Sequence, residues 1–349
     1  MEKKIRVLIV GSKGYIGSSL YIFLKKRNYD VFGIDNLLYG KTWFGDNKQN
    51  NFKKIDVRDV KKSFLKKFSH VIFLAGLSNN PIDDLFPNKA YNLVKNYTIN
   101  FAKMCKKENI KFIFPSSCSV YGYSVNKLNE KSKVNPITYY SKNKIEIEKE
   151  LKKISDINFR PIILRFATVF GFSNSLRLDL VTNIFMTMFL IKKKILLNSD
   201  GMANRPHIGI DDVCKTFELM INHMNKKFEI FNVGYNHYNY KIIDVALKIC
   251  KSKKRIKYVG NKKSFFKDSI VKGKDKRNYI ISFDKISKKF DHFKKKNFFS
   301  SDLLKFKKKL KNSNILNEKL LFNKNFYRLQ KIKENIKKNK SDLFLRTKT

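Results

Sequence analysis

The hydrophobic positions in the first half of the chain form short apolar runs that alternate with segments of helical periodicity. Continuous apolar runs between turn residues are typical of buried strands, and apolar residues three and four apart indicate amphipathic helices. This alternation predicts an α/β fold, a Rossmann-type doubly wound parallel sheet with helices on both faces. The predicted strands cover 5–10, 30–35, 52–56, 70–76, 110–117, 161–171 and 228–234, and the predicted helices begin near 15, 88 and 140.

The alternation is less regular in 172–204 and after 247, where we expect a smaller C-terminal subdomain. The sheet domain is expected to span 1–171, with strands returning near 205–246. Apolar residues keep helical spacing beyond residue 300, which predicts helices that fray only past about 338. Residues 247–338 would then complete the smaller subdomain, and 339–349 would form a basic tail.

Composition excludes several classes of protein. No apolar stretch approaches the roughly 20 residues that a membrane helix needs. The basic N-terminus is followed by only a short apolar run and then by a Gly-rich turn, which does not fit a signal peptide. The four cysteines are widely scattered without metal-ligand spacing, so we expect reduced thiols. Together these features predict a cytoplasmic protein with no membrane partner.

The chain is strongly basic, with 75 Lys plus Arg against 29 Asp plus Glu and a formal net charge of +46. Such a surface attracts polyanions, and nucleic acid is the first partner to consider. No zinc-finger, basic-zipper or RNA-binding aromatic signature accompanies the charge, and charge alone gives only nonspecific affinity. We therefore do not expect nucleic acid as a functional partner.

A Gly-rich turn follows the first predicted strand, with the sequence GSKGYIG over residues 11–17. Glycines between a strand and a helix let backbone N–H groups approach a pyrophosphate, although this spacing differs from the common G-x-G-x-x-G fingerprint. Asp35 ends the next strand, where a carboxylate can accept both ribose hydroxyls of NAD and repel a 2′-phosphate. An ordinary tight turn beside an exposed Asp is the alternative. The predicted NAD contacts are Gly11, Gly14, Tyr15, Ile16, Gly17, Asp35, Asp56, Val57, Ala75, Gly76, Tyr140 and Lys144.

Tyr140 and Lys144 are four residues apart, which places both on one face of a helix. An ammonium there can lower the pKa of the phenol and hold the cofactor ribose. Dense lysine makes this spacing common in the chain, but only this pair opens a helix shortly after a strand that ends in small hydroxyl residues. That strand leads into SSCSVYG over 116–122, in which Ser117 is either a pocket hydroxyl or the start of a turn.

With the Gly turn, Asp35, SSCSVYG and Y-x-x-x-K in this order, the chain resembles the extended short-chain dehydrogenase/reductases. Within them it is similar to the NAD-dependent nucleotide-sugar epimerase/dehydratase family, from residue 5 to about 290. LAGLSNNP (74–81), LRFATVFG (164–171), DGMANRPHIGIDDV (200–213) and DKRNYIISFDK (275–285) add to the resemblance. It implies an NAD-binding sheet domain, a substrate-binding subdomain and, as in many relatives, a homodimer.

The resemblance also implies roles for individual residues. Tyr140 would be the catalytic acid/base, Lys144 its electrostatic partner, and Ser117 a hydrogen-bonding group for the reacting sugar oxygen. Arg205 and Arg277 would hold the nucleotide diphosphate, since forked guanidinium groups suit phosphate oxygens. Asn183 would contact the sugar nucleotide, whereas His207, in a strand-like run, is expected to be structural.

Three departures from the family pattern shape the functional hypothesis. Cys118 and Ser119 stand where dehydratases of the family have an Asp and a Glu, so the proton carriers for dehydration are missing. Thr168 and the stretch VKNYT (94–98) also depart from the pattern and leave the sugar open. We therefore favour a UDP-glucose 4-epimerase-like enzyme over a 4-ketoreductase and, third, a 4,6-dehydratase. A noncatalytic NAD-binding protein with a basic partner-binding surface is the alternative from another class.

Overall fold

A seven-stranded sheet forms the centre of the computed structural model, which describes residues 5–40, 43–44, 49–77, 87–223, 225–258, 277–294, 298–338, 340–341 and 346–347. The strand order is β11-β7-β5-β4-β1-β2-β3, and each pairing in it is parallel. The predicted Rossmann-type fold is confirmed. The strands are β1 (Arg6–Val10), β2 (Asp30–Asp35), β3 (Phe52–Lys54), β4 (His70–Phe73), β5 (Lys111–Ser117), β7 (Ile162–Phe166) and β11 (Glu229–Val233).

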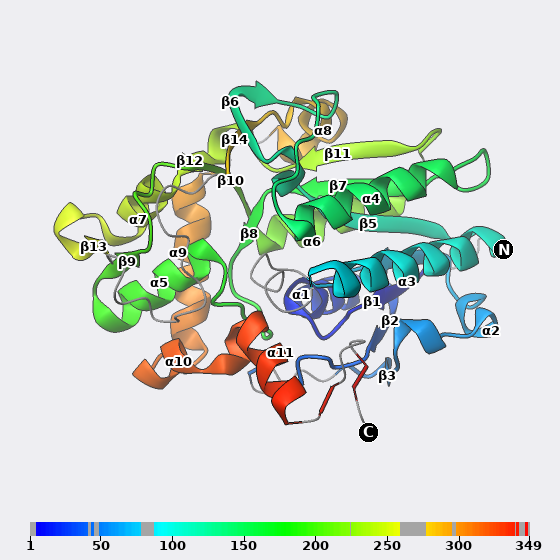
Figure 1. Cartoon of the computed structure of the whole chain (residues 1–349), viewed down its shortest axis with the longest axis horizontal. Helices are drawn as coiled ribbons and strands as arrows, with labels where there is room; N and C mark the ends of the chain where they lie inside the picture. The colour runs from blue at the N-terminus through cyan, green and yellow to red at the C-terminus, as the bar shows by residue number, and fades with distance from the viewer. Residues whose placement is uncertain are drawn as a thin grey trace.

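Helices cover both faces of this sheet (Figure 1). Successive side chains of a strand point to opposite faces, so Val7 and Ile9 of β1 pack into one buried cluster and Leu8 and Val10 into another. Residues of α1 and α6 belong to the first cluster, and residues of α3 and α4 to the second. The bounds of these helices are α1 (Tyr15–Lys25), α3 (Pro87–Lys107), α4 (Tyr139–Lys153) and α6 (Ile210–Asn222).

The order of the strands reverses between β1 and β4, which lie side by side at the middle of the sheet. Parallel sheets bind ligands outside the carboxyl ends of the strands at such a reversal. The loops that leave β1 and β4, beginning at Gly11 and Leu74, start at this edge. The fold therefore places the Gly-rich turn where a ligand site is expected.

Smaller sheets and further helices lie beside the large sheet (Figure 1). The helices predicted beyond residue 300 are present, and the last of them ends at Lys337. None of the helices in the described ranges is long and apolar enough to cross a bilayer. The remaining elements are β6 (Tyr123–Leu128), β8 (Thr168–Phe170), β9 (Ile195–Leu197), β10 (Asn204–Gly209), β12 (Asn239–Lys241), β13 (Ile256–Tyr258), β14 (Asn278–Ile281), α2 (Lys62–Leu65), α5 (Val181–Lys192), α7 (Ile242–Cys250), α8 (Asp284–Lys289), α9 (Phe299–Asn312), α10 (Glu318–Phe322) and α11 (Arg328–Lys337).

The single strand predicted over 161–171 is wrong. The chain breaks pairing at Ala167, so β7 lies in the large sheet while β8 pairs with β10 in a three-stranded sheet of order β12-β10-β8. An uninterrupted apolar run cannot reveal such a break, because the strands on both sides of it are buried. Of the strands expected to return near 205–246, β11 joins the large sheet and β10 and β12 do not. The domain boundaries themselves stay a prediction, and most of 339–349 lies outside the described residues.

Candidate active site

One cavity of about 670 Å³ opens at the carboxyl ends of the central strands. Its walls come from the Gly-rich turn, the ends of β2 and β5, the first turns of α4, and the N-terminus of α11. The structure thus brings together residues that are far apart in the sequence. The predicted site residues that line it are Gly11, Gly14, Tyr15, Ile16, Gly17, Asp35, Asp56, Val57, Ala75, Gly76, Ser117, Tyr140, Lys144, Arg205 and Arg277.

The Gly-rich turn is shaped by close backbone contacts. Gly11 has a φ of +91°, and a Cβ atom there would lie 2.8 Å from the backbone nitrogen of Ala75. A Cβ atom on Gly17 would lie 2.2 Å from the carbonyl oxygen of Gly11, so only glycine lets α1 approach the turn this closely. Gly14 caps α1 without a side-chain hydrogen bond. The turn therefore leaves room for an anion to approach the first N–H groups of the helix.

Asp35 lies at the end of β2 on the same side of the cavity. Its carboxylate accepts hydrogen bonds from the backbone N–H groups of Lys13 (3.1 Å) and Leu37 (2.8 Å), which fix its position beside the turn. Burial raises the pKa of Asp35 above its usual range, and these two hydrogen bonds partly oppose the shift. A carboxylate held in this way can accept hydrogen bonds from ribose hydroxyls.

Asp56 lies nearby, just before Val57. Its carboxylate accepts hydrogen bonds from Arg58 Nε (2.7 Å) and Asn36 Nδ2 (3.1 Å). Burial raises the pKa of Asp56, but the bonds from Arg58 and Asn36 outweigh it, and the net pKa falls below the usual value. Asp56 is therefore ionised at neutral pH and held by its own neighbours.

Tyr140 is held by the capping box at the start of α4. Thr138 Oγ1 accepts from the Ser141 N–H (3.2 Å), and Ser141 Oγ accepts from the Thr138 N–H (3.1 Å). Lys144 follows one turn later, and its Nζ donates to the Pro115 carbonyl at 2.8 Å and lies 5.7 Å from the centre of the Tyr140 ring. Ser117, at the end of β5, hydrogen-bonds the Tyr140 side chain. Hydroxyl, phenol and ammonium thus meet at one wall of the cavity.

Burial is the main influence on the pKa values of Tyr140 and Lys144. It raises the pKa of Tyr140 to about 12, while the positive charge of Arg177 and the hydrogen bond to Ser117 act in the opposite direction. Burial lowers the pKa of Lys144 to about 8, with Glu148 opposing the shift. Arg177 is thus one cation that favours the Tyr140 phenolate, and the role of Lys144 as its electrostatic partner stays a prediction.

Arg177 was missed by the sequence analysis. Its guanidinium binds the Asp179 carboxylate through two contacts, Nε–Oδ1 at 2.9 Å and Nη2–Oδ2 at 3.1 Å, and it is 7% exposed. Tyr39 and Arg328 line the cavity as well and were also missed. In a chain with 75 Lys and Arg residues, no local pattern separates these arginines from surface ones.

Arg205 and Arg277 meet at the wall contributed by the smaller sheets. Arg205 is 6% exposed, and its Nη1 donates to the carbonyl oxygens of Asn204 (2.7 Å) and Arg277. Its guanidinium carbon lies 5.0 Å from the centre of the Tyr279 ring. The two guanidinium groups give this end of the cavity a positive wall suited to phosphate oxygens.

Asn183 does not line the cavity, contrary to the predicted sugar-nucleotide contact. It is fully buried in α5, where its amide donates to Tyr15 Oη (3.2 Å) and the Arg177 carbonyl (3.0 Å) and accepts from the Gly171 N–H (3.0 Å). These bonds fix the loop that carries Arg177. His207 is also fully buried, against Phe170 and Phe299, and lies outside the cavity wall.

The two positions after Ser117 carry no acid. Cys118 is buried with its thiol directed at the Arg165 carbonyl (3.1 Å), and Ser119 lines the cavity with a hydroxyl that makes no hydrogen bond to a described residue. Among the described residues, the carboxylates that line the cavity are Asp35, Asp56 and Asp179. The last of these is paired with Arg177. None of the three occupies position 118 or 119, directly after Ser117.

Comparison with known proteins identifies relatives of this chain. The model of the NAD-dependent epimerase/dehydratase family matches residues 7–234. A UDP-glucose 4-epimerase of Lactobacillus helveticus is 27% identical over 275 residues, which are 70% of this chain and 82% of the relative. A dTDP-D-glucose 4,6-dehydratase of Dictyostelium discoideum is 28% identical over 273 residues, which are 70% of this chain and 61% of the relative.

Solved structures share the fold. A UDP-N-acetylglucosamine 4-epimerase from Methanobrevibacter ruminantium, solved in complex with UDP-N-acetylmuramic acid, superposes with a TM-score of 0.74 at 22% identity. The match covers 89% of this chain and 99% of the other chain. Almost the whole of that structure thus has a counterpart here, while part of the present chain lies outside the match.

Proposed function

The chain belongs to the NAD-dependent epimerase/dehydratase family, and on that premise we propose that it is an epimerase of nucleotide sugars. As a member of this family it is an enzyme that acts on nucleotide sugars with NAD as cofactor. The observation that carries the epimerase proposal is the cavity wall formed by Ser117, Tyr140 and Lys144, with no acid at positions 118 and 119. The chemistry of that wall is proton transfer at a sugar hydroxyl.

The residues of the cavity fit the cofactor. Gly11 leaves the space that a Cβ atom would fill, and the uncapped start of α1 can receive the pyrophosphate. Asp35 would hold the adenosine ribose, and Lys144 would hold the ribose beside the nicotinamide. Asp56 and Val57 would lie against the adenine. When bound, NAD takes up a hydride from the sugar carbon and gives it back.

Tyr140 would remove the proton from the sugar hydroxyl and later return it. The charge of Arg177 and the hydrogen bond from Ser117 favour its phenolate against the effect of burial. Ser117 would also position the sugar oxygen. General acid–base groups of this kind contribute roughly 10²–10⁴-fold to a rate. Because Tyr140 gives back the proton that it takes, its protonation state is restored at the end of each turnover.

Arg205 and Arg277 would hold the diphosphate of the nucleotide sugar. Both line the cavity at the wall contributed by the smaller sheets, and the fork of a guanidinium matches the oxygens of a phosphate. With its phosphates fixed there, the sugar would reach Tyr140 while remaining free to turn after oxidation. A homodimer and a cytoplasmic location stay predictions, and light scattering of the purified protein tests the first.

Two other reactions are compatible with the fold. A 4-ketoreductase would use the same Tyr140 and would consume a reduced cofactor in each turnover. A 4,6-dehydratase, as in the Dictyostelium relative, must remove water and needs further proton carriers. Cys118 is turned away from the cavity and Ser119 supplies only a hydroxyl, so dehydration is the least supported of the three.

The proposal is tested by incubating the purified protein with a panel of UDP-, dTDP- and ADP-sugars without added cofactor, followed by chromatography and mass spectrometry. An epimerase gives a new peak of unchanged mass. Loss of water identifies a dehydratase, and turnover only with NADH and a keto sugar identifies a reductase. Either result overturns the epimerase proposal.

A further inference from the structure

The C-terminal helix α11 joins two walls of the cavity that come from distant parts of the chain. Leu329 and Ile332 pack with Leu38 in one buried cluster, and Asn335 Nδ2 donates to the Leu38 carbonyl at 2.8 Å. At its other end, the Arg328 N–H donates to Asp179 Oδ2 at 3.4 Å. The helix therefore spans from the loop after β2, which carries Asp35, to the loop before α5 (Figure 1).

Arg328 is buried in this position, and one of its two terminal nitrogens has no hydrogen-bonding partner in the described part of the chain. Its side chain is 2% exposed and lines the cavity, and its Nη1 makes no hydrogen bond with any described residue. The guanidinium carbon lies 4.6 Å from the centre of the Tyr39 ring. Burial and the charge of Arg177 lower the pKa of Arg328. The carboxylates of Asp179 and Asp35 oppose the shift without cancelling it. A buried guanidinium in this state is costly unless an anion meets it.

Two further buried polar atoms at this wall have no partner among the described residues. They are the hydroxyl of Tyr39 and Oε1 of Gln330, and both residues line the cavity. Together with Arg328 they place two donors and one acceptor within the same cavity wall. That set suits a ligand with phosphate oxygens and sugar hydroxyls, and Asp35, the predicted ribose contact, lies close enough to act on the charge of Arg328.

We propose that Arg328 binds the diphosphate of NAD, and that α11 closes the cofactor site and retains NAD between turnovers. This proposal rests on the proposed function, in which NAD is restored in every cycle and has no need to leave. Arg177 is already paired with Asp179, so Arg328 is the guanidinium at this wall with an uncommitted nitrogen among the described residues. It acts as a positioning residue for the cofactor.

The test measures binding to the full-length chain freed of nucleotide, by calorimetry, with NAD, ADP, adenosine and UDP as probes. Arg328→Gln is expected to raise the Kd of NAD and of ADP roughly tenfold or more, because a charge-assisted phosphate contact is lost. Adenosine and UDP should bind as they do to the parent protein. Lys337→Gln is the matched control, since it removes an exposed charge from the same helix and should change none of the four.

Three outcomes overturn the proposal. If ADP and adenosine lose affinity equally, Arg328 has a packing role, and if NAD binds unchanged, it has no role in cofactor binding. If only the binding of UDP is weakened, Arg328 contacts the substrate diphosphate instead. Arg328→Lys keeps the charge and loses the guanidinium fork, so if the glutamine variant does not fold, this variant should still weaken the binding of NAD and ADP, by less, and leave that of adenosine unchanged. Because these readouts need no turnover, a protein inactive on every nucleotide sugar would refute the epimerase proposal and leave this one standing.

Discussion

Tyr139 and Tyr140 are adjacent in the chain but lie in different surroundings. The side chain of Tyr139 is 40% exposed on the outside of α4, whereas Tyr140 lines the cavity and hydrogen-bonds with Ser117. Only Tyr140 has a lysine four residues later, so the sequence alone could select it. The sequence could not show that Arg177, 37 positions further along, would bring a positive charge that favours its phenolate.

Replacing Tyr140 by Phe tests the acid/base role at the scale of one atom. The variant is expected to lose roughly 10²–10⁴-fold in kcat, because no group replaces the phenol oxygen in proton transfer. Steady-state kinetics on the nucleotide sugar found in the panel measure the loss. Tyr139→Phe is the matched control and should retain full activity, so equal losses in both variants would contradict the assignment.

The burial of neutral His207 should make the free energy of unfolding depend on pH. Burial lowers its pKa from 6.5 to about 4, so between these values the unfolded chain binds a proton that the folded chain does not. The stability that depends on neutral His207 is fully present above pH 6.5 and is lost as the pH falls toward 4. At pH 5 the contribution of His207 to the free energy of unfolding is about 2 kcal/mol less than at pH 7. Urea unfolding at both pH values measures the drop, and His207→Gln should make it smaller; an unchanged drop would contradict the account.

At the scale of elements, the site depends on how α4 begins. The capping box of Thr138 and Ser141 fixes the first turn, and Tyr140 lies within that turn. The sequence predicted the strands and helices that carry the site because their apolar periods are clear. It could not predict that β7 and β8 belong to different sheets or that Asn183 is turned inward, because both depend on long-range contacts.

Removing the cap tests this link between local structure and the site. Thr138→Ala should lower the free energy of unfolding by about 1 kcal/mol, since one backbone N–H loses its acceptor. It should also reduce kcat more than it changes KM, because Tyr140 is less well positioned. Denaturant titration and kinetics check both effects. Thr138→Ser keeps a capping hydroxyl and should keep both the stability and the kcat of the parent protein. A fall in stability without any change in kcat would separate the cap from the site.

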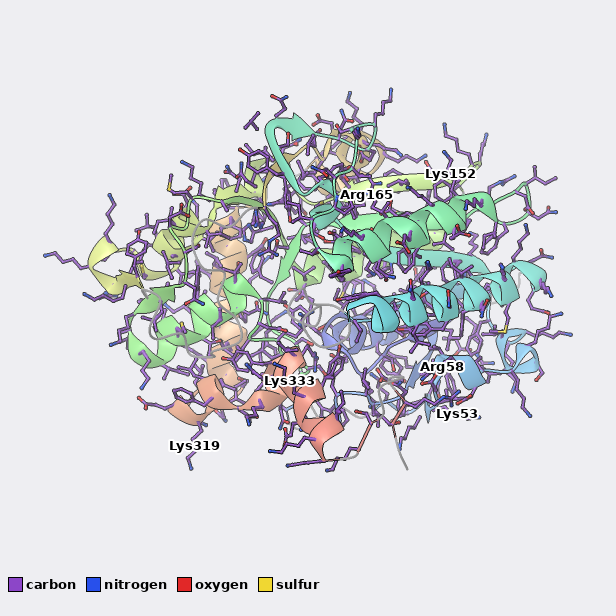
Figure 2. The ribbon with its side chains drawn as sticks, in the orientation of Figure 1. Lys53, Arg58, Lys152, Arg165, Lys319 and Lys333 are labelled. Atoms are coloured by element: carbon purple, nitrogen blue, oxygen red, sulfur yellow. The ribbon has the colours of Figure 1, made fainter. Side chains whose placement is uncertain are left out.

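At the scale of the whole molecule, the dominant feature is positive charge. Lys152 on α4 and Lys319 on α10 are exposed on elements far apart in the fold, and Figure 2 shows both pointing away from the ribbon. A net charge of +46 repels itself in the compact state, while part of the positive charge lines the cavity as arginine. A cationic enzyme also attracts substrates that carry a diphosphate.

The charge predicts an unusual response to salt. Raising NaCl from about 0.05 to about 0.5 M should raise the Tm, because screening weakens the repulsion between like charges more than it weakens the fewer ion pairs. Calorimetry at a fixed pH measures the shift. A Tm that falls over this range would mean that ion pairs, rather than repulsion, dominate the electrostatics of the fold.

The proposed epimerase inverts a nucleotide sugar by removing and returning the same carbon-bound hydrogen. The most direct measurement is the reaction in D2O without added cofactor, with mass analysis after hydroxyl deuterium has been washed out in H2O. We expect an isomeric product with no carbon-bound deuterium, because a hydride returned by bound NAD would not exchange with solvent. A product that carries solvent deuterium on the sugar carbon would contradict it.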